Sequence, residues 1–266
     1  MAGARLWRHL VGARVRSEWQ YRASFFALFT ASLLFSLTDF VAVVLVFEQV
    51  PSIADWSIAE VAFLYGTGVT AAALADATIG AVESVPDRIR LGTFDRLLVR
   101  PAPALLQIVG DDFALRRFGK VLQSAVILGV AIAAVDVEWT VARAAMIPLM
   151  IISGTSLFTS IWIVSNSVAF WFTDTREAAN SVTYGGSYLS QYPLAVYGRW
   201  FRRLFAVAVP ISFVNYLPAL FVLQRPTDLG FAPWMRFASP LVALLALIVA
   251  AQVWALGIRH YRSTGS

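Results

Sequence analysis

Two acidic residues, Asp39 and Asp76, lie inside long apolar stretches of this chain. An ionised carboxylate is costly in such surroundings, so both residues are candidates for binding a cation or passing a proton. A proton relay needs a succession of ionisable groups, and two acids at different depths on antiparallel helices do not supply one. Each carboxylate can instead be a hydrogen-bonded packing group, and both interpretations stay open.

A second set of polar groups follows one face of a later apolar stretch. At about 3.6 residues per turn, these serines share one side of a helix: Ser153, Ser156, Ser160 and Ser167. Stripes of small polar residues favour close helix packing and interhelical hydrogen bonds. The lining of a polar pathway is the alternative interpretation.

The sequence offers little support for catalysis by this chain alone. Residues 154–156, Gly-Thr-Ser, resemble part of a serine hydrolase turn, yet no histidine lies in an apolar stretch to act as the base. The two histidines, His9 and His260, stand near opposite ends, so a shared metal site would require the ends to meet. The absence of cysteine excludes thiolate metal sites and cysteine nucleophiles. We expect no catalytic residue, metal or cofactor on this chain.

A nucleotide-binding loop is not recognisable either. The nearest candidate, residues 110–120, has too many residues between its glycines for a P-loop, and no Ser or Thr follows its lysine. A helix is the better interpretation, with Asp112 and Arg116 forming an ion pair at spacing i, i+4. Any ATP must therefore be bound by another chain.

The composition is that of a membrane protein. Of the 266 residues, 59% are hydrophobic and 14% are charged, with a mean hydropathy of +0.69. A helix needs about 20 mostly apolar residues to cross a bilayer, and its backbone must satisfy its own hydrogen bonds there. Pro210, Asn215 and Pro218 predict a bend in the fifth such stretch. We predict an all-α integral membrane protein with six transmembrane helices, at about 23–47, 57–82, 118–135, 141–172, 204–223 and 237–256.

The basic residues predict the orientation of these helices, since Lys and Arg concentrate in cytoplasmic loops. Most of the 21 Lys and Arg residues fall in the N-terminal segment, the second loop, the fourth loop or the C-terminal tail; the exceptions are Arg143, Arg225 and Arg236. This distribution places both termini in the cytoplasm. It also accounts for the net charge of +5 through contact with the lipid bilayer, without nucleic acid.

The first 22 residues are too rich in arginine for a cleaved signal peptide, so we expect them to remain attached. As a helix, they place Leu6, Trp7, Leu10, Val11 and Val15 on one side and basic residues on the other. This pattern is typical of an amphipathic interfacial helix in the plane of the lipid headgroups. A solvated basic flank is the alternative.

The longest expected cytoplasmic loop, residues 83–117, contains the compact charged segment RLGTFDRLLVRP. Gly92 breaks the segment before it, and Thr93 can cap a new helix. The apolar residues of that helix share a face: Phe94, Leu97 and Leu98. A two-turn amphipathic helix is marginally stable alone and gains order by docking. It can dock onto the base of its own helices or into a groove on a partner protein.

Three segments resemble the six-span permease subunits of type 2 ABC transporters, in particular a small bacterial subgroup. They are QYRASFF at 20–26, RLGTFDRLLVRP at 90–101 and SQYPLAVYGRWFRR at 190–203. The resemblance covers nearly the whole chain, and it implies a single permease domain over residues 1–266 in a bacterial cytoplasmic membrane. The second cytoplasmic loop, at 173–203, is longer and richer in aromatic and basic residues than in better-known members.

The resemblance also implies partners. A permease of this kind is a half-unit that pairs with a second permease, identical or related, and with two cytosolic ATPase subunits that bind ATP and magnesium. In the family, the first cytoplasmic loop carries a coupling helix that fits a groove on the ATPase, and the N-terminal segment is an interfacial helix. The coupling role falls here on Phe94, Asp95, Arg96, Leu97 and Leu98.

The leading hypothesis is therefore the permease subunit of an ATP-driven exporter, with the pathway at a dimer interface. An ion-coupled secondary transporter that uses Asp39 or Asp76 is a second hypothesis, which the sparse intramembrane charge and the missing inverted repeat disfavour. A membrane scaffold that transports nothing is a third.

Overall fold

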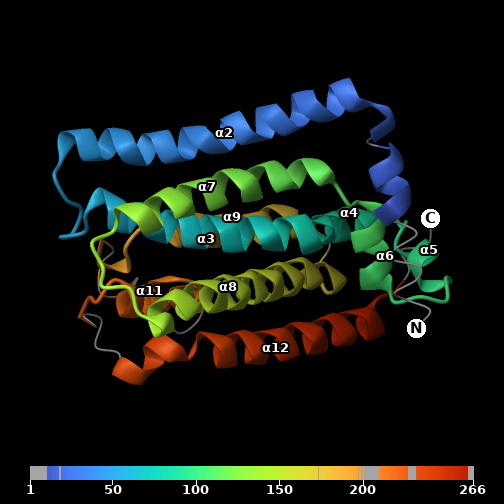
Figure 1. Cartoon of the computed structure of the whole chain (residues 1–266). Coiled ribbons are helices and arrows are strands. Elements are labelled where there is room, and N and C mark those ends of the chain that lie inside the picture. Colours follow the sequence, from blue (N-terminus) through green and yellow to red (C-terminus); the bar gives the residue numbers. More distant parts are fainter. Residues whose placement is uncertain are drawn as a thin grey trace.

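A computed structural model describes residues 11–17, 19–172, 174–196, 198, 200, 210–226 and 232–262. Helices that run side by side along one axis dominate this part of the chain (Figure 1). The described residues contain no strand, which agrees with the all-α prediction. The long helices are α2 (Arg22–Gln49), α3 (Ile58–Ile79), α7 (Phe118–Ala134), α8 (Val141–Ser167) and α12 (Ser239–His260).

These long helices correspond to five of the six expected membrane spans. Among the described residues, five helical stretches are long and apolar enough to cross a membrane, which makes the chain a multi-pass membrane protein. The second stretch continues beyond α3 through the 3₁₀ helix η1 (Gly80–Ser84) into α4 (Val85–Arg90), and the fourth continues beyond α8 into η3 (Val168–Phe170). The side chains of α2 are mostly exposed, because this helix packs chiefly along α7.

The fifth expected span, 204–223, is not a single straight helix where the structure describes it. From Pro210 onward the chain forms the 3₁₀ helix η5 (Ile211–Phe213) and the short helix α11 (Tyr216–Val222); residues 204–209 lie outside the described part. A helix of seven residues spans only about 10 Å, which is a third of a bilayer core. Of the residues that predicted a bend, Asn215 lies at the break between η5 and α11, Pro210 directly precedes η5, and Pro218 lies within α11.

Part of the expected second cytoplasmic loop, 173–203, is instead the helix α9 (Arg176–Leu189), which packs against α8 and α3. In Figure 1 it is seen behind α3. Its buried residues are small: Ala179, Thr183, Gly186 and Ser187. Small residues let helix backbones approach closely without raising local hydropathy, and for this reason a hydropathy scan passes over α9.

The C-terminal end of α9 meets η5 and α11 beside α3, and the contacts there are between polar groups. The Asn215 side-chain amide donates to the carbonyl of Ser190 at 2.7 Å and to that of Leu64 at 2.8 Å. A Cβ at Gly68 of α3 would lie 2.7 Å from the Ser190 Oγ, so only glycine fits there. Buried Asn215 thus satisfies a carbonyl that the end of α9 leaves without a helical partner, as a low-dielectric interior requires.

One end of the bundle is closed by an ion pair between the first turn of α3 and the loop after α11. Arg225 donates from Nε to Glu60 Oε1 at 2.6 Å and from Nη2 to Glu60 Oε2 at 2.9 Å, and its guanidinium lies 4.5 Å from the ring centroid of Trp56. Glu60 also completes a capping box with Ser57 at the start of α3. This end carries the three arginines that the charge count set apart from the rest.

The opposite end, called the basic end here, is formed by α4, the single-turn helix α5 (Asp95–Leu98), α6 (Ala104–Asp111) and the 3₁₀ helix η2 (Leu115–Arg117). Residues 11–17 are helical, and Arg14 donates from Nε to the carbonyl of Asp111, which places this N-terminal helix beside the end of α6. Val11 and Val15 of the expected apolar face are half-buried; Leu6, Trp7 and Leu10 lie outside the described residues.

Candidate functional site

The loop at the basic end turns sharply before α5. Gly92 has φ of 67°, the left-handed conformation that glycine adopts most readily. The backbone N–H of Phe94 then donates to the carbonyl of Arg88 at 3.1 Å, and Thr93 donates from Oγ1 to the same carbonyl at 3.3 Å. The sequence predicted that Thr93 would cap the following helix, but its side chain does not do so. Helix α5 also has only one turn, where two were expected.

Phe94 is buried within its own chain, with an exposed fraction of 0%. Its ring centroid lies 5.3 Å from that of Phe170 and 5.1 Å from that of Tyr261, both in edge-to-face geometry. Leu97 is buried in the same apolar cluster. Of the two docking alternatives, these two residues follow the first, because the aromatic rings just beyond α8 and α12 cover them.

A buried amide holds the far side of this loop in place. Gln107 of α6 donates from Nε2 to the carbonyl of Leu97 at 2.9 Å and to that of Ala102 at 2.8 Å. Its side chain is fully buried. Two backbone carbonyls that would otherwise lack partners are thereby satisfied, and the end of α5 is fixed to α6.

Asp95 faces the C-terminal end of α12. Burial and the nearby Asp95 carboxylate raise the pKa of Tyr261 to about 12, so this phenol keeps its proton at physiological pH. Asp95 thus contributes to contacts inside the chain, as Phe94 and Leu97 do.

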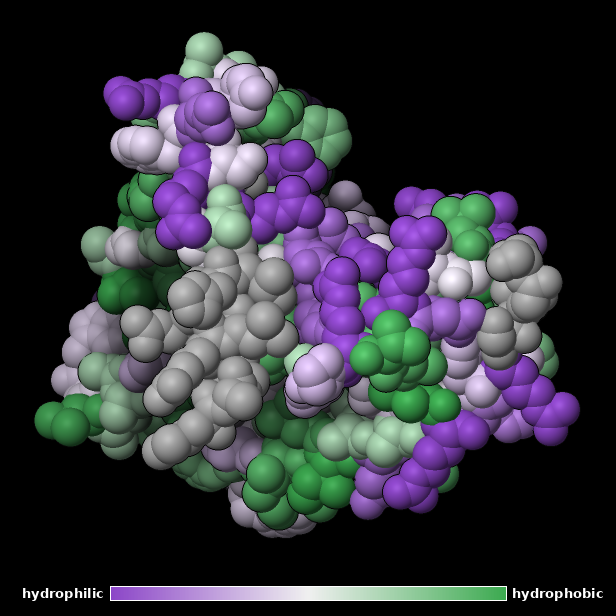
Figure 2. Space-filling view, turned by 90° about the vertical axis from the view of Figure 1, so that its right-hand side faces the viewer, coloured by the Kyte–Doolittle hydropathy of each residue, from purple (hydrophilic) through white to green (hydrophobic). Residues whose placement is uncertain are grey.

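The remaining residues of the loop point away from the bundle. Val99 is 84% exposed and Leu98 is 43% exposed. Together with their exposed neighbours they form what we call the loop surface: Leu91, Arg96, Leu98, Val99 and Arg100. Figure 2 looks onto the basic end and shows hydrophilic side chains next to groups of hydrophobic side chains. Apolar residues rimmed by arginines are typical of a protein interaction site.

Ion pairs connect the loop to the helices around it. Arg88 of α4 pairs with Asp112 at 3.1 Å, and Asp87 of α4 pairs with Arg176 at the start of α9. The predicted pair between Asp112 and Arg116 does not form, because α6 ends at Asp111 and Asp112 turns toward Arg88. A displacement of α4 and α5 would therefore reach α6 and α9 directly.

Asp76 lies in the last turn of α3, and Arg117 of η2 forms an ion pair with it. The Arg117 Nε is 3.3 Å from Asp76 Oδ1, and Arg117 also donates from Nη1 to the Asp76 carbonyl at 3.4 Å. Gly80 leaves room for this contact, since a side chain there would overlap the carboxylate. Of the two interpretations of Asp76, the packing group agrees with this pairing, and Asp39 is not its partner.

Tyrosines on α9 form a polar face that sequence reasoning missed. Tyr184 and Tyr188 are exposed at spacing i, i+4, and Tyr184 donates to Glu83 Oε2 at 3.2 Å. Half-buried Asp39 of α2 is close enough to Tyr192 for the two groups to interact electrostatically. The signal was the tyrosine spacing within 184–192, but the interpretation of this segment as a loop concealed it.

The serine stripe of α8 is bonded to its own helix. Ser156 donates to the carbonyl of Ile152, Ser160 to that of Ser156 and Ser167 to that of Ile163, at 2.6 to 2.9 Å. Ser153, Ser160 and Ser167 are buried. Any residue larger than glycine at position 154 would place its Cβ 2.9 Å from the Cβ of Ala71 in α3, so the two helices pack closely there. These contacts favour packing over a pathway lining.

Metal-binding geometry is absent from the part of the chain that the structure describes. No group of three or more His, Asp or Glu residues could hold an ion among those residues. The His260 ring stacks on Trp171 at 5.9 Å between ring centroids, and His9 lies outside the described residues.

Comparison with known proteins places this arrangement in a family. No curated protein and no solved structure matches the chain. The model of a family described as "ABC-2 family transporter protein" matches residues 33–265, which is nearly the whole chain and includes all five long apolar helices in whole or in large part. This membrane protein of packed apolar helices, with its interhelical loop docked at the basic end, therefore belongs to the ABC-2 transporter family as a type 2 permease.

Proposed function

We propose that this chain is the permease subunit of an ATP-driven exporter in a bacterial cytoplasmic membrane, with both termini in the cytoplasm. It would pair with a second permease subunit and with cytosolic ABC ATPase subunits, which would bind ATP and magnesium. The observation that carries this proposal is the loop surface, which projects from a loop held by Phe94 and Gln107 at the basic end. Family membership supports the same assignment.

The packing of the loop suggests how movement passes into the membrane. An ATPase that pushes on Val99 and Leu98 moves α5, and buried Phe94 transfers that displacement to the ends of α8 and α12 through Phe170 and Tyr261. The ion pair between Asp87 and Arg176 carries it to α9. Close-packed interiors transmit such shifts because they deform little.

The exposed polar face of α9 is the part of this chain best suited to line a pathway. Tyr184 and Tyr188 lie on it, with Glu83 beside Tyr184, and half-buried Tyr192 follows just beyond the end of α9 with Asp39 nearby. A second permease subunit facing these residues would enclose them, giving alternating access between two subunits. An ion-coupled transporter is less well supported, because Arg117 already neutralises Asp76.

The assignment is tested by expressing the chain with a candidate ABC ATPase, beginning with one encoded beside it. We expect the two proteins to co-purify and, together in liposomes, to hydrolyse ATP. Substitution of the Walker lysine in the ATPase should reduce the rate of hydrolysis by a factor of roughly ten or more. Transport driven by an ion gradient without any ATPase would favour the secondary transporter, and purification of the chain without an ATPase would favour the scaffold.

The orientation can be tested cleanly because the chain has no cysteine. Val99 at the basic end and Val141 at the opposite end are 84% and 89% exposed. In spheroplasts, a membrane-impermeant maleimide should label Val141→Cys at once and Val99→Cys only after lysis. The reverse pattern would place the loop surface outside the cell and remove it from any cytosolic ATPase.

A further inference from the structure

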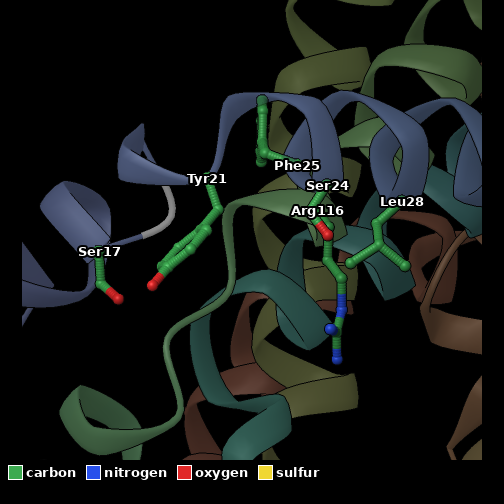
Figure 3. A pocket seen from close by; sticks show the side chains of 6 residues that line it. All are labelled: Ser17, Tyr21, Ser24, Phe25, Leu28 and Arg116. Atoms are coloured by element: carbon green, nitrogen blue, oxygen red, sulfur yellow. The ribbon is translucent and has the colours of Figure 1, made fainter.

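A cavity of about 260 Å³ lies at the basic end where the N-terminal helix, the start of α2 and η2 meet. Figure 3 shows Ser17 and Tyr21 on one side of it and Ser24, Leu28 and Arg116 on the other. Its lining residues are Ser17, Tyr21, Ser24, Phe25, Leu28 and Arg116. Three side chains with hydroxyls, one guanidinium and two apolar side chains thus line one space.

Arg116 brings a positive charge that forms no direct ion pair in the described part of the chain, although it is close enough to Asp76 to interact with that carboxylate electrostatically. Its neighbour Arg117 pairs with Asp76, and Asp112 pairs with Arg88. Among the described residues, the Arg116 guanidinium makes no ion pair or hydrogen bond. An arginine with five N–H donors facing a cavity is suited to a phosphate or carboxylate, which it binds through paired hydrogen bonds.

The other polar groups of the cavity are also donors without acceptors. The hydroxyls of Ser17, Tyr21 and Ser24 form no hydrogen bond within the described residues. The N-cap of α2, Tyr21, makes no side-chain cap, and the first turn of α2 has no acidic residue. The first backbone N–H groups of a long helix therefore add a partial positive charge beside the cavity.

The apolar side of the cavity continues along a helix that the rest of the chain leaves uncovered. Phe25 and Leu28 line the cavity, and beyond them α2 exposes further large apolar side chains, including Phe26, Leu34 and Phe35. In a membrane this face lies against acyl chains. A ligand that matches both parts has an anionic head and a hydrocarbon tail.

We propose that this cavity binds the phosphate headgroup of an anionic phospholipid from the cytoplasmic leaflet, with its acyl chains along α2. The proposal rests on the orientation given under Proposed function, and it does not depend on what the protein transports. Arg116 pairs with the phosphate, the three hydroxyls donate to its oxygens, and Phe25 and Leu28 contact the first methylene groups of the tail. A bound lipid would hold the start of α2 and the N-terminal helix against η2.

The experiment is native mass spectrometry of the detergent-purified full chain, titrated with phosphatidylglycerol or with phosphatidylcholine of the same acyl chains. We expect wild type to bind phosphatidylglycerol at least tenfold more tightly, and Arg116→Gln to reduce this preference to roughly twofold or less. Arg116→Lys should keep part of it. Arg100→Gln removes an exposed arginine of the loop surface and should leave lipid binding unchanged.

Further arms separate the possible sources of the anion. Inorganic phosphate at millimolar concentration should not displace the lipid, because it lacks the tail; displacement would show that the site takes a free anion and overturn the lipid assignment. Equal binding of both lipids, or an unchanged preference in Arg116→Gln with an unchanged thermal unfolding midpoint, would overturn the site itself. Neither result bears on ATPase binding, so failure here is distinct from failure of the permease assignment.

Discussion

Replacing Val99 with Asp is expected to reduce the amount of ATPase that co-purifies with the permease at least tenfold, with no change in the thermal unfolding midpoint. Val99 is 84% exposed and contacts no buried cluster, so a charge there leaves the fold intact. The same charge would be buried unpaired in the apolar part of an interface, which costs roughly 2 kcal/mol or more. Leu98→Asp should behave in the same way.

Two comparison variants separate coupling from folding. Val141→Asp places the same substitution on an equally exposed residue at the opposite end and should retain the ATPase. Phe94→Ala should lower stability by about 3 to 5 kcal/mol, because it opens a cavity between Phe170 and Tyr261. If Val99→Asp and Leu98→Asp both retain the ATPase at wild-type levels, the loop surface is not the contact. Phe94 offers no alternative contact, since its ring is fully buried.

Arg117→Gln is expected to destabilise the protein by about 2 to 3 kcal/mol. The substitution leaves the Asp76 carboxylate without its partner at the end of an apolar helix, where an unpaired charge is poorly solvated. The side chains retain exposed fractions of 20% and 31%, so the cost falls below that of a fully buried pair. Thermal unfolding in detergent, followed by circular dichroism, measures the change.

The neighbouring arginine provides a matched control for this variant. Arg116→Gln removes the same charge one residue away, without breaking a direct ion pair, and should lower the unfolding midpoint much less than Arg117→Gln does. The double variant Asp76→Asn with Arg117→Gln should recover most of the stability, because it removes both charges together. A loss in the double variant as large as in Arg117→Gln alone would show that Arg117 acts through packing and not through Asp76.

Hydropathy and charge in the sequence were sufficient to predict the long helices. Stretches such as 141–172 are apolar over more residues than a bilayer requires, and no soluble fold accommodates several of them. Charge bias then separated the end with Arg225 from the end with Arg88. Helix α9 was not predicted, because its packing face consists of Ala, Thr, Gly and Ser, which carry little hydropathy signal.

The segment 94–98 shows which features a local sequence pattern can predict and which it cannot. Amphipathic spacing correctly grouped Phe94 with Leu97 and separated them from Arg96. The same spacing also placed Leu98 with the buried pair, although Leu98 is exposed. Which side faces a partner depends on Phe170 and Tyr261, which are distant in sequence and reach Phe94 only when α8 and α12 end at the same level.

The order and composition of the residues were enough to show that this protein crosses a membrane, that most of its arginines lie at one end and that it carries no recognisable nucleotide-binding motif. These properties follow from composition and local order, which do not depend on what packs against what. Only the three-dimensional structure shows that Phe94 is buried, that Arg117 forms the ion pair with Asp76, and that Arg116 lines a cavity. Each of these features depends on contacts between residues that are far apart in the chain. A sequence pattern does not specify which of two neighbouring arginines will form the ion pair, because that depends on how the helices pack.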